Sequence, residues 1–422
     1  MPLAPANSLL PGLASPRDHQ LANGARVVAL PLAEAPLVCL DFWCRAGSIF
    51  EDNRESGMAH FLEHMVFKGS EQLGPGQFDL RIEAMGGNSN AATGFDDVHY
   101  HVLIPPEAAG DALDLLLDLV LRPRLEADAF QMERQVVLEE LAQSEDQPDE
   151  MALQKLLQLG CPGHAYGEPI LGRRELLQSQ TPAAMAEFHQ RLYGANRCVL
   201  ALTGALDPEE LIERIEGSAL ADLPAVVEPP QRPPLAVCAG DHRLALPRLE
   251  SARLLMLWGL PPAADLHGVM GADLLTTVLA EGRRSRLVER LREQLRIVES
   301  IDLDLHVMES GSFALLEAIC EPDELPAVRQ AISEVWTELM TEGLPDAEWR
   351  RAQRLVANGY RFGLEAAGGV AGLIGNNHLW GRCHGLTLPL EDIDAWSAEA
   401  LLQDGLPLLD PSRACVLEAV PA

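Results

Sequence analysis

Residues 57–67 read Gly-Met-Ala-His-Phe-Leu-Glu-His-Met-Val-Phe. The Ala, Leu, Met and Phe residues around the two histidines favour a helix, and Ser56 is placed to cap its start. On a helix, His60 and His64 lie one turn apart, so both imidazoles can reach one metal ion. Glu63 lies at the rim of that face, where it is better placed to hold a water beside the metal than to bind the metal. The stretch therefore predicts the inverted zinc-site pattern H-x-x-E-H.

A third ligand is needed, because a catalytic zinc site has three protein ligands and a water. Residues 132–141 read Met-Glu-Arg-Gln-Val-Val-Leu-Glu-Glu-Leu and have helical spacing. Glu133 and Glu140 are separated by two helical turns and share a face, whereas Glu139 points about a third of a turn away. We therefore expect the third ligand to be a carboxylate from this second helix.

The chain divides at a proline-rich segment. Five prolines lie between Asp222 and Asp241, and proline fixes φ and removes a hydrogen-bond donor, so we expect an extended connector. Strand-like runs occur on both sides of it, at residues 26–30, 38–43 and 253–258, and each side continues into stretches with helical spacing. The expected fold is α+β, with two similar domains at residues 1–224 and 241–422 joined by a linker at 225–240.

Charge and composition exclude several classes of function. The 63 Asp and Glu residues outnumber the 32 Lys and Arg residues, and the net charge of −31 would repel a nucleic-acid backbone. No apolar run approaches the roughly 20 residues that a membrane span requires. The first 20 residues show no export signal, and the eight cysteines form no C-x-x-C pair. We therefore expect a cytoplasmic protein that binds neither nucleic acid nor membranes.

With these motifs in place, the sequence resembles the pitrilysin-type (M16) zinc metallopeptidases. That family has H-x-x-E-H followed by a Glu 76 residues after the second His, and here 140 − 64 = 76. Carried over by position, His60, His64 and Glu140 match the zinc ligands, Glu63 the general base, and Glu133 a supporting catalytic carboxylate. Further matching stretches are Gly-Gly-Asn-Ser-Asn-Ala-Ala-Thr at residues 86–93, Pro-Ile-Leu-Gly at 169–172, Ser-Arg-Leu at 285–287 and Leu-Arg-Glu at 291–293.

The resemblance implies a zinc-dependent endopeptidase that hydrolyses peptides or small proteins. In this family two similar domains form each small subunit, and two subunits close like a clamshell around a chamber. Glu63 would act as general base on the zinc-bound water. Strand-forming residues around Asn90 and Ala91 would offer an edge to which an extended peptide substrate adds as a further strand.

One departure from the family concerns the partner subunit. The relatives carry an Arg followed seven residues later by a Tyr, and this pair reaches the zinc site across the chamber. Here Arg292 is followed at that spacing by Glu299, which cannot donate a hydrogen bond to a developing oxyanion. The expected assembly is therefore a heterodimer with a related subunit that supplies the Arg/Tyr pair, with a homodimer as the alternative.

Two other functions fit parts of the sequence. The chain could be a non-catalytic or assembly subunit of such a heterodimer, although that class commonly loses the His or Glu residues present here. An enzyme of the S-ribosylhomocysteine lyase type also uses H-x-x-E-H, but those chains are short single domains. We expect His99, His101 and His164 to be structural. General peptide turnover, removal of targeting segments and maturation of a small peptide all fit as the substrate class.

Overall fold

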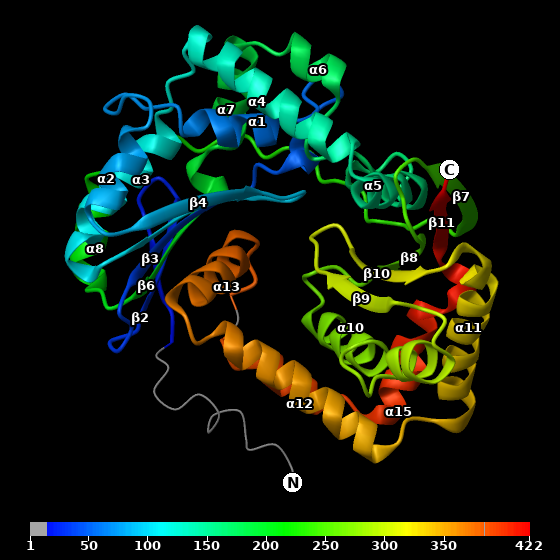
Figure 1. The fold of residues 1–422 in the computed structure, drawn as a ribbon. Helices are drawn as coiled ribbons and strands as arrows, with labels where there is room; N and C mark the ends of the chain where they lie inside the picture. The colour runs from blue at the N-terminus through cyan, green and yellow to red at the C-terminus, as the bar shows by residue number, and fades with distance from the viewer. Residues whose placement is uncertain (1–14, 384) are drawn as a thin grey trace.

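The computed structural model describes residues 15–383 and 385–422, which form two β-sheets with helices packed on them (Figure 1). The first sheet has the order β1-β2-β6-β3-β5-β4 and the second the order β7-β11-β8-β10-β9. The strands of the first sheet are β1 (Arg17–Gln20), β2 (Arg26–Pro31), β3 (Val38–Cys44), β4 (Asn88–Thr93), β5 (Val98–Ile104) and β6 (Cys198–Gly204). Those of the second are β7 (Gly240–Leu246), β8 (Ala252–Leu260), β9 (Ser300–His306), β10 (Ser312–Cys320) and β11 (Cys415–Pro421).

Apart from β1, the two sheets have the same topology. In each, the first and last strands of the half pair in parallel (β2 with β6, β7 with β11), and the remaining pairs are antiparallel. The third strand of each half, β4 or β9, lies at a free edge of its sheet. The mixed α/β fold with two similar domains expected from the sequence is therefore confirmed.

Helices cover both sheets. The helices of the first half are α1 (Met58–Val66), α2 (Gln77–Ala84), α3 (Ala109–Leu121), α4 (Ala127–Glu145), α5 (Pro148–Gly160), α6 (Arg174–Ser179), α7 (Pro182–Leu192), α8 (Pro208–Glu216) and α9 (Ala219–Asp222). Those of the second half are α10 (Leu266–Leu279), η6 (Val288–Leu295), α11 (Leu325–Glu342), α12 (Asp346–Gly363), α13 (Ala367–Leu379), α14 (Leu388–Ala395) and α15 (Ala398–Ala400). Residues 223–239, between the two sheets, form neither helix nor strand.

The central strands β3 and β6 are buried on both faces, which explains why their sequences are mostly apolar, with Asp41 and Thr203 as the buried polar residues. Leu40 and Phe42 point toward a core that includes α1, α3 and α7. Cys39 and Trp43 point to the opposite face and pack against α13, which reaches over from the second half of the chain (Figure 1). A Cβ atom on Gly375 would come within 2.5 Å of the Trp43 ring, so this close packing depends on glycine.

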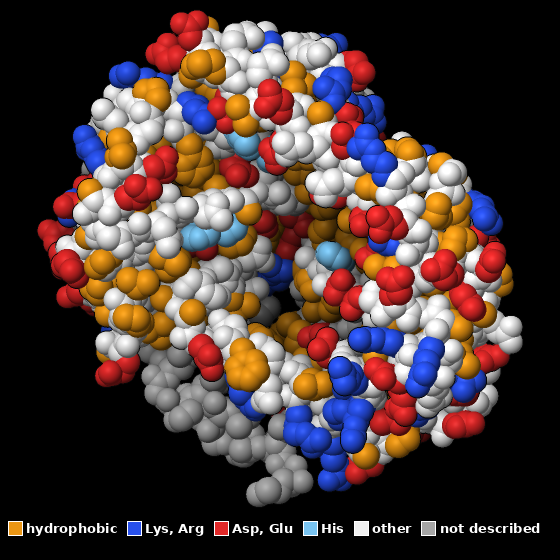
Figure 2. All heavy atoms as spheres, in the orientation of Figure 1, with side chains coloured by type: hydrophobic (Ala, Val, Ile, Leu, Met, Phe, Trp, Pro, Cys, Tyr) orange, Lys and Arg blue, Asp and Glu red, His pale blue; other side chains and the backbone are white. Residues whose placement is uncertain are grey.

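The second sheet receives a helix in return. Leu156 and Leu157 of α5, from the first half, pack against Leu257, Cys415 and neighbouring side chains of β8 and β11. Each half therefore contributes one helix to the other half's sheet. In the space-filling view, the surface is hollowed between the two halves, and acidic and apolar side chains line the hollow (Figure 2).

Candidate metal centre

The helix α1 carries the H-x-x-E-H residues and packs through its apolar side into the first core. Met58, Phe61 and Leu62 are fully buried there. The helix begins after Gly57, and the carboxylate of Glu51 caps it by accepting hydrogen bonds from the backbone N–H groups of Gly57 (3.0 Å) and Ala59 (2.8 Å). The predicted cap was therefore wrong: Oγ of Ser56 is buried and bonds no described residue. The two oxygens of Glu51 satisfy two of the free N–H groups at once, while burial raises the pKa of Glu51 to about 8.

The structure brings His60, His64 and Glu140 together. The two imidazole rings on α1 are 4.7 Å apart, at 67° to one another. Glu140, on α4, places Oε1 3.7 Å from Nε2 of His60 and Oε2 3.4 Å from Nε2 of His64. Burial, together with the neighbouring His64 ring, lowers the pKa of His60 to about 4, so this ring is neutral at pH 7. A neutral imidazole can bind a metal.

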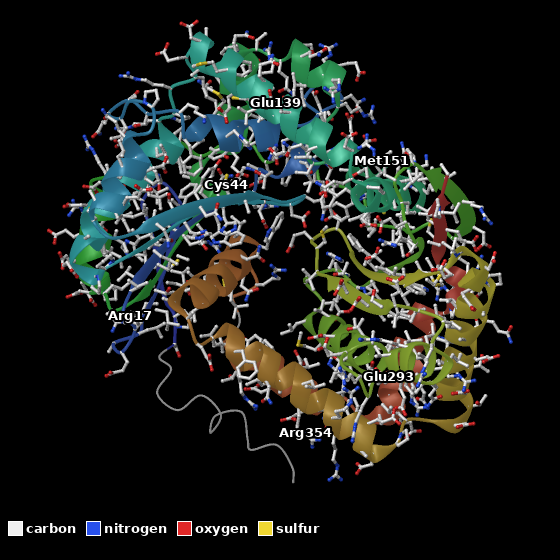
Figure 3. The ribbon with its side chains drawn as sticks, viewed as in Figure 1. Arg17, Cys44, Glu139, Met151, Glu293 and Arg354 are labelled. Carbon is white, nitrogen blue, oxygen red and sulfur yellow. The ribbon has the colours of Figure 1, made fainter. Side chains whose placement is uncertain are left out.

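Glu133 contacts His64 on the ring edge opposite Glu140: Glu133 bonds Nδ1, whereas Glu140 lies near Nε2. Its Oε1 accepts a hydrogen bond from Nδ1 of His64 at 2.9 Å, and its Oε2 pairs with Nζ of Lys68 at 2.8 Å. Burial alone would raise the pKa of Glu133, but these two partners bring it below its usual value. Glu133 therefore stays charged and fixes the His64 tautomer that directs Nε2 toward Glu140. Glu139, one residue before Glu140, is exposed on the outside of α4 (Figure 3).

Glu63 contacts the sheet rather than the two histidines. Its Oε2 accepts a hydrogen bond of 2.5 Å from Oγ1 of Thr93, at the end of β4. Burial raises the pKa of Glu63, while the Thr93 hydroxyl and the nearby His64 oppose that rise. The carboxylate is therefore held beside the ligand cluster without joining it.

The donor atoms fit a zinc ion. One ligand atom from each of His60, His64 and Glu140 lies within 4.8 Å of the other two. A tetrahedral zinc with bonds of about 2.1 Å places its ligand atoms about 3.4 Å apart, close to the two distances measured to Glu140. Nδ1 of His60 is buried and bonds no described side chain or backbone group. Two imidazoles and a carboxylate are a donor set that suits zinc.

The other predicted site residues lie on separate elements. Asn90 and Ala91 lie in β4, which among the described residues pairs with β5 alone and so presents a free edge. Asn90 is exposed and Ala91 half-buried. Arg292 is exposed on η6, which packs against β9 of the second sheet. Glu299, seven residues later, accepts a hydrogen bond of 3.2 Å from Ser251.

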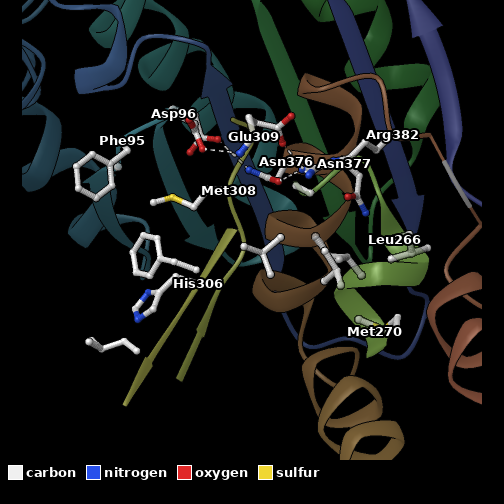
Figure 4. A pocket seen from close by; sticks show the side chains of 18 of the residues that line it. Phe95, Asp96, Leu266, Met270, His306, Met308, Glu309, Asn376, Asn377 and Arg382 are labelled. Carbon is white, nitrogen blue, oxygen red and sulfur yellow. Dashed lines mark hydrogen bonds and ion pairs between the residues drawn. The ribbon is translucent and has the colours of Figure 1, made fainter. Parts of the chain in front are cut away.

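A cavity of about 590 Å³ opens between the two halves (Figure 4). Its walls come from the loop after β4, the loop between β9 and β10, α10, and α13 with the segment that follows. The labelled lining residues are Phe95, Asp96, Leu266, Met270, His306, Met308, Glu309, Asn376, Asn377 and Arg382. Most of the lining is apolar, and the polar groups gather where the two loops meet.

Acidic side chains join the two halves at this cavity. Glu309 pairs with Arg382 at 2.7 Å, and its backbone N–H donates to Asp96 at 3.0 Å. Asp97 accepts hydrogen bonds from Asn376 (3.0 Å) and Trp380 (2.9 Å). Burial raises the pKa of Glu309 to about 7 and that of Asp97 to about 6. Asp96, Asp97 and Glu309 thus lie together at the contact between the halves. Among the described residues, the cation that pairs directly with one of them is Arg382.

Comparison with known proteins now identifies the family. Residues 26–174 match the family model described as Insulinase (Peptidase family M16), and residues 179–356 match the one described as Peptidase M16 inactive domain. The chain belongs to peptidase family M16. This membership confirms the resemblance noted in the sequence, and together the two matches include every strand of the two sheets except β1 and β11.

The similarity to individual proteins extends over nearly the whole chain in some cases and over about half of it in another. An uncharacterized zinc protease of Mycobacterium leprae is 29% identical over 384 residues, which are 90% of this chain and 86% of that protein. A probable mitochondrial-processing peptidase subunit beta of Arabidopsis thaliana is 32% identical over 200 residues, 47% of this chain and 38% of that protein. A protease from Helicobacter pylori has the same fold, with a TM-score of 0.90 at 22% identity, covering 97% of this chain and 100% of that one.

Membership of M16 establishes the metal. The family binds zinc and the relatives are named zinc proteases, so the expected Zn²⁺ cofactor is confirmed. It also supports a zinc peptidase, at the level of the family. Among the described residues, no helix has both the length and the apolar character needed to cross a membrane.

Three residues of this M16 centre were missed in the sequence. Glu51 caps α1, Lys68 pairs with Glu133, and Thr93 holds Glu63. Lys68 had a local signal, because it follows His64 by four residues. Thr93 closes the stretch at residues 86–93 that resembles the family, but only the folded sheet shows that it faces Glu63.

Proposed function

We propose that this chain is a zinc-dependent endopeptidase that hydrolyses peptides or small proteins within a closed chamber. His60, His64 and Glu140 bind the metal, Glu63 is the general base, and Glu133 supports catalysis through His64. The observation that carries the proposal is the convergence of two imidazoles and a carboxylate from two helices, with Glu63 fixed beside them by Thr93.

The protein's own residues do the following work. When bound, zinc lowers the pKa of a coordinated water to about 7 and polarises a carbonyl group. Glu63 accepts a proton from the attacking water and returns it to the leaving amine. Glu133 keeps His64 oriented, and Lys68 balances the charge of Glu133. The buried position of His60 excludes water from one side of the cluster.

Substrate recognition is proposed at the edge of the first sheet. β4 has no strand partner beyond β5 among the described residues, so its outer backbone groups are available to an extended peptide. Asn90 and Ala91 would bind such a peptide by adding it as a further strand, with main-chain hydrogen bonds supplying the affinity. Thr93, in the same strand, then brings the scissile bond near Glu63.

We further propose a clamshell dimer in the cytoplasm. Residues 1–224 are the catalytic domain, residues 241–422 a second domain without a metal site, and residues 225–240 their linker. Because Glu299 stands where the family has a Tyr, the favoured assembly is a heterodimer whose related subunit supplies the Arg/Tyr pair, while Arg292 contacts substrate; a homodimer is the alternative. The exposed position of Arg292 supports this, since an exposed arginine is available to a chamber.

The competing function is a non-catalytic or assembly subunit. One experiment separates the two: zinc content and digestion of a peptide library are measured for the chain, for Glu63→Gln and for Glu139→Gln, each with and without a related M16 subunit carrying the Arg/Tyr pair. We expect all three to hold zinc, and the chain and Glu139→Gln to cleave weakly alone and faster with the partner. Glu63→Gln should not cleave. Retained cleavage by Glu63→Gln, or no cleavage by the zinc-loaded chain with any such partner, would overturn the proposal.

A further inference from the structure

Three side chains outside the α1 centre converge on the other face of the first sheet. They are Asp41 of β3 and His99 and His101 of β5, and one ligand atom from each lies within 4.8 Å of the other two. Asp41 and His101 are directly opposite in the antiparallel pair, and His99 is opposite Trp43, two residues along. Side chains directly or diagonally opposite across two strands are within reach of one another. The sheet register therefore brings the cluster together.

One of these groups, His101, has a ring nitrogen without a partner among the described residues, and Asp41 has a single ion-pair partner. The Asp41 side chain is only 3% exposed, and His99 is its one ion-pair partner among the described residues, at 3.0 Å. Nδ1 of His101 is buried and bonds no described residue. A buried carboxylate is normally paired with a cation or bound to a metal, and a buried unbonded nitrogen requires a partner of its own. One cation between these side chains would satisfy both.

The ring of His99 is already fixed in place. It stacks on Trp43 with the ring centroids 4.2 Å apart and the planes at 14°. The His101 ring lies 5.5 Å beyond it at 19° and is only partly buried. The carboxylates of Asp97 and Glu63 add negative charge around His99. The stacked rings thus hold the two imidazoles beside Asp41, and the surrounding negative charge favours a positive ion.

We propose that Asp41, His99 and His101 form a second binding site for a divalent transition-metal ion, with Zn²⁺ as its occupant. Two imidazoles and a carboxylate select such an ion over Mg²⁺ or Ca²⁺, which prefer oxygen ligands. The bound ion would connect β3 to β5 on the face covered by α13. It shares no ligand with the His60, His64 and Glu140 cluster, so the inference stands whether or not the chain is a peptidase.

The test is the zinc content of the whole chain after saturation and removal of free metal. We expect the unaltered chain to retain a second ion that His101→Ala loses, and His64→Ala to keep the second ion while losing the first. His267→Ala is the matched control, because His267 also stacks on a tryptophan (Trp396, 4.4 Å) beside a carboxylate (Asp392, 3.5 Å) but belongs to no three-residue ligand cluster in the described part of the chain. It should retain as much zinc as the unaltered chain.

A second measurement protects the test against loss of fold. Added zinc should raise the melting temperature of His64→Ala but not that of the double variant His64→Ala/His101→Ala. The proposal is wrong if the saturated chain holds a single ion. It is also wrong if His101→Ala keeps the second ion, or if His267→Ala loses zinc to the same extent, since the extra metal would then be bound at surface histidines.

Discussion

Thr93 on the edge strand β4 donates a hydrogen bond to Glu63 on α1, with the two oxygens 2.5 Å apart. The contact joins the strand proposed to receive substrate to the side chain proposed as general base. A general base must be placed within reach of the proton it removes. The hydrogen bond from Thr93 orients Glu63 for this role, although Thr93 itself transfers no proton.

Thr93→Val should therefore lower kcat without removing zinc. Valine keeps the shape of threonine but not its hydroxyl, and a hydrogen bond to a charged group contributes about 1.5–3 kcal/mol. At about 1.4 kcal/mol per factor of ten, we expect kcat to fall about tenfold to a hundredfold. Peptide hydrolysis and zinc content are measured together. Thr341→Val, on the exposed side of α11, should leave kcat unchanged. An unchanged kcat in Thr93→Val would remove Thr93 from the mechanism.

Glu133→Ala should weaken zinc binding about 10- to 100-fold, the usual effect of losing a carboxylate that orients a metal-binding histidine. The His64 ring would lose its bond to Oε1, and Lys68 its ion pair. Competition with a chelator measures the affinity. Glu133→Gln keeps an acceptor for His64, so its zinc affinity should lie between that of the unaltered chain and that of Glu133→Ala. The exposed Glu139→Ala is the control, and a zinc affinity for Glu133→Ala equal to that of this control would contradict the prediction.

Glu309 should make the protein less stable as pH rises. Burial raises its pKa from 4.5 to about 7 in the folded chain. At pH values between 4.5 and about 7, the folded state binds more protons than the unfolded state. The free energy of unfolding therefore decreases with increasing pH. We expect Glu309→Gln to gain stability over the unaltered chain between pH 5 and pH 8, as measured by urea unfolding. The exposed Glu107→Gln should show no such trend. A pH-independent difference would place the effect in packing instead.

Gly375→Ala should destabilise the chain by about 1–3 kcal/mol, the usual cost of overfilling a packed core. The added Cβ would meet Trp43 at 2.5 Å and force α13 away from the first sheet. Gly359→Ala in α12 is the counterpart, since nothing lies within 4 Å of its Cβ position; it should stabilise by about 0.4–1 kcal/mol. Thermal unfolding of both variants measures the difference. Equal melting temperatures would show that the Trp43 contact is not rigid.

The sequence predicted those parts of the centre that depend on local spacing. The i, i+4 relation of His60 and His64 and the heptad relation of Glu133 and Glu140 follow from helical geometry alone, and the strands at residues 26–30, 38–43 and 253–258 were confirmed as β2, β3 and β8. The cap of α1 was not predictable in this way. The loop before α1 places Glu51, and not the nearer Ser56, where it can bond the N–H groups at the start of the helix. No local sequence pattern indicates the path of that loop.

Contacts across the sheet were also beyond the sequence. His99 and His101 gave no reason to expect chemistry until the register placed Asp41 opposite His101. Similarly, the small residues of α13, with glycines at 368, 369 and 372, gave no local sign of a partner. In the fold, Gly368 and Gly372 lie toward Leu103 of β5 and Trp43 of β3, in the sheet of the other half of the chain, whereas Gly369 lies against the backbone of Gly363 in α12.

The reciprocal exchange of α5 and α13 has a consequence for how the polypeptide comes apart. Each half, produced alone, would expose the apolar sheet face that the helix of the other half normally covers. Its own exchanged helix, α5 or α13, would lose the sheet against which it packs. A single proteolytic cleavage near residue 230 should therefore leave the two fragments associated. On heating, both sheets should unfold in one cooperative transition rather than one after the other.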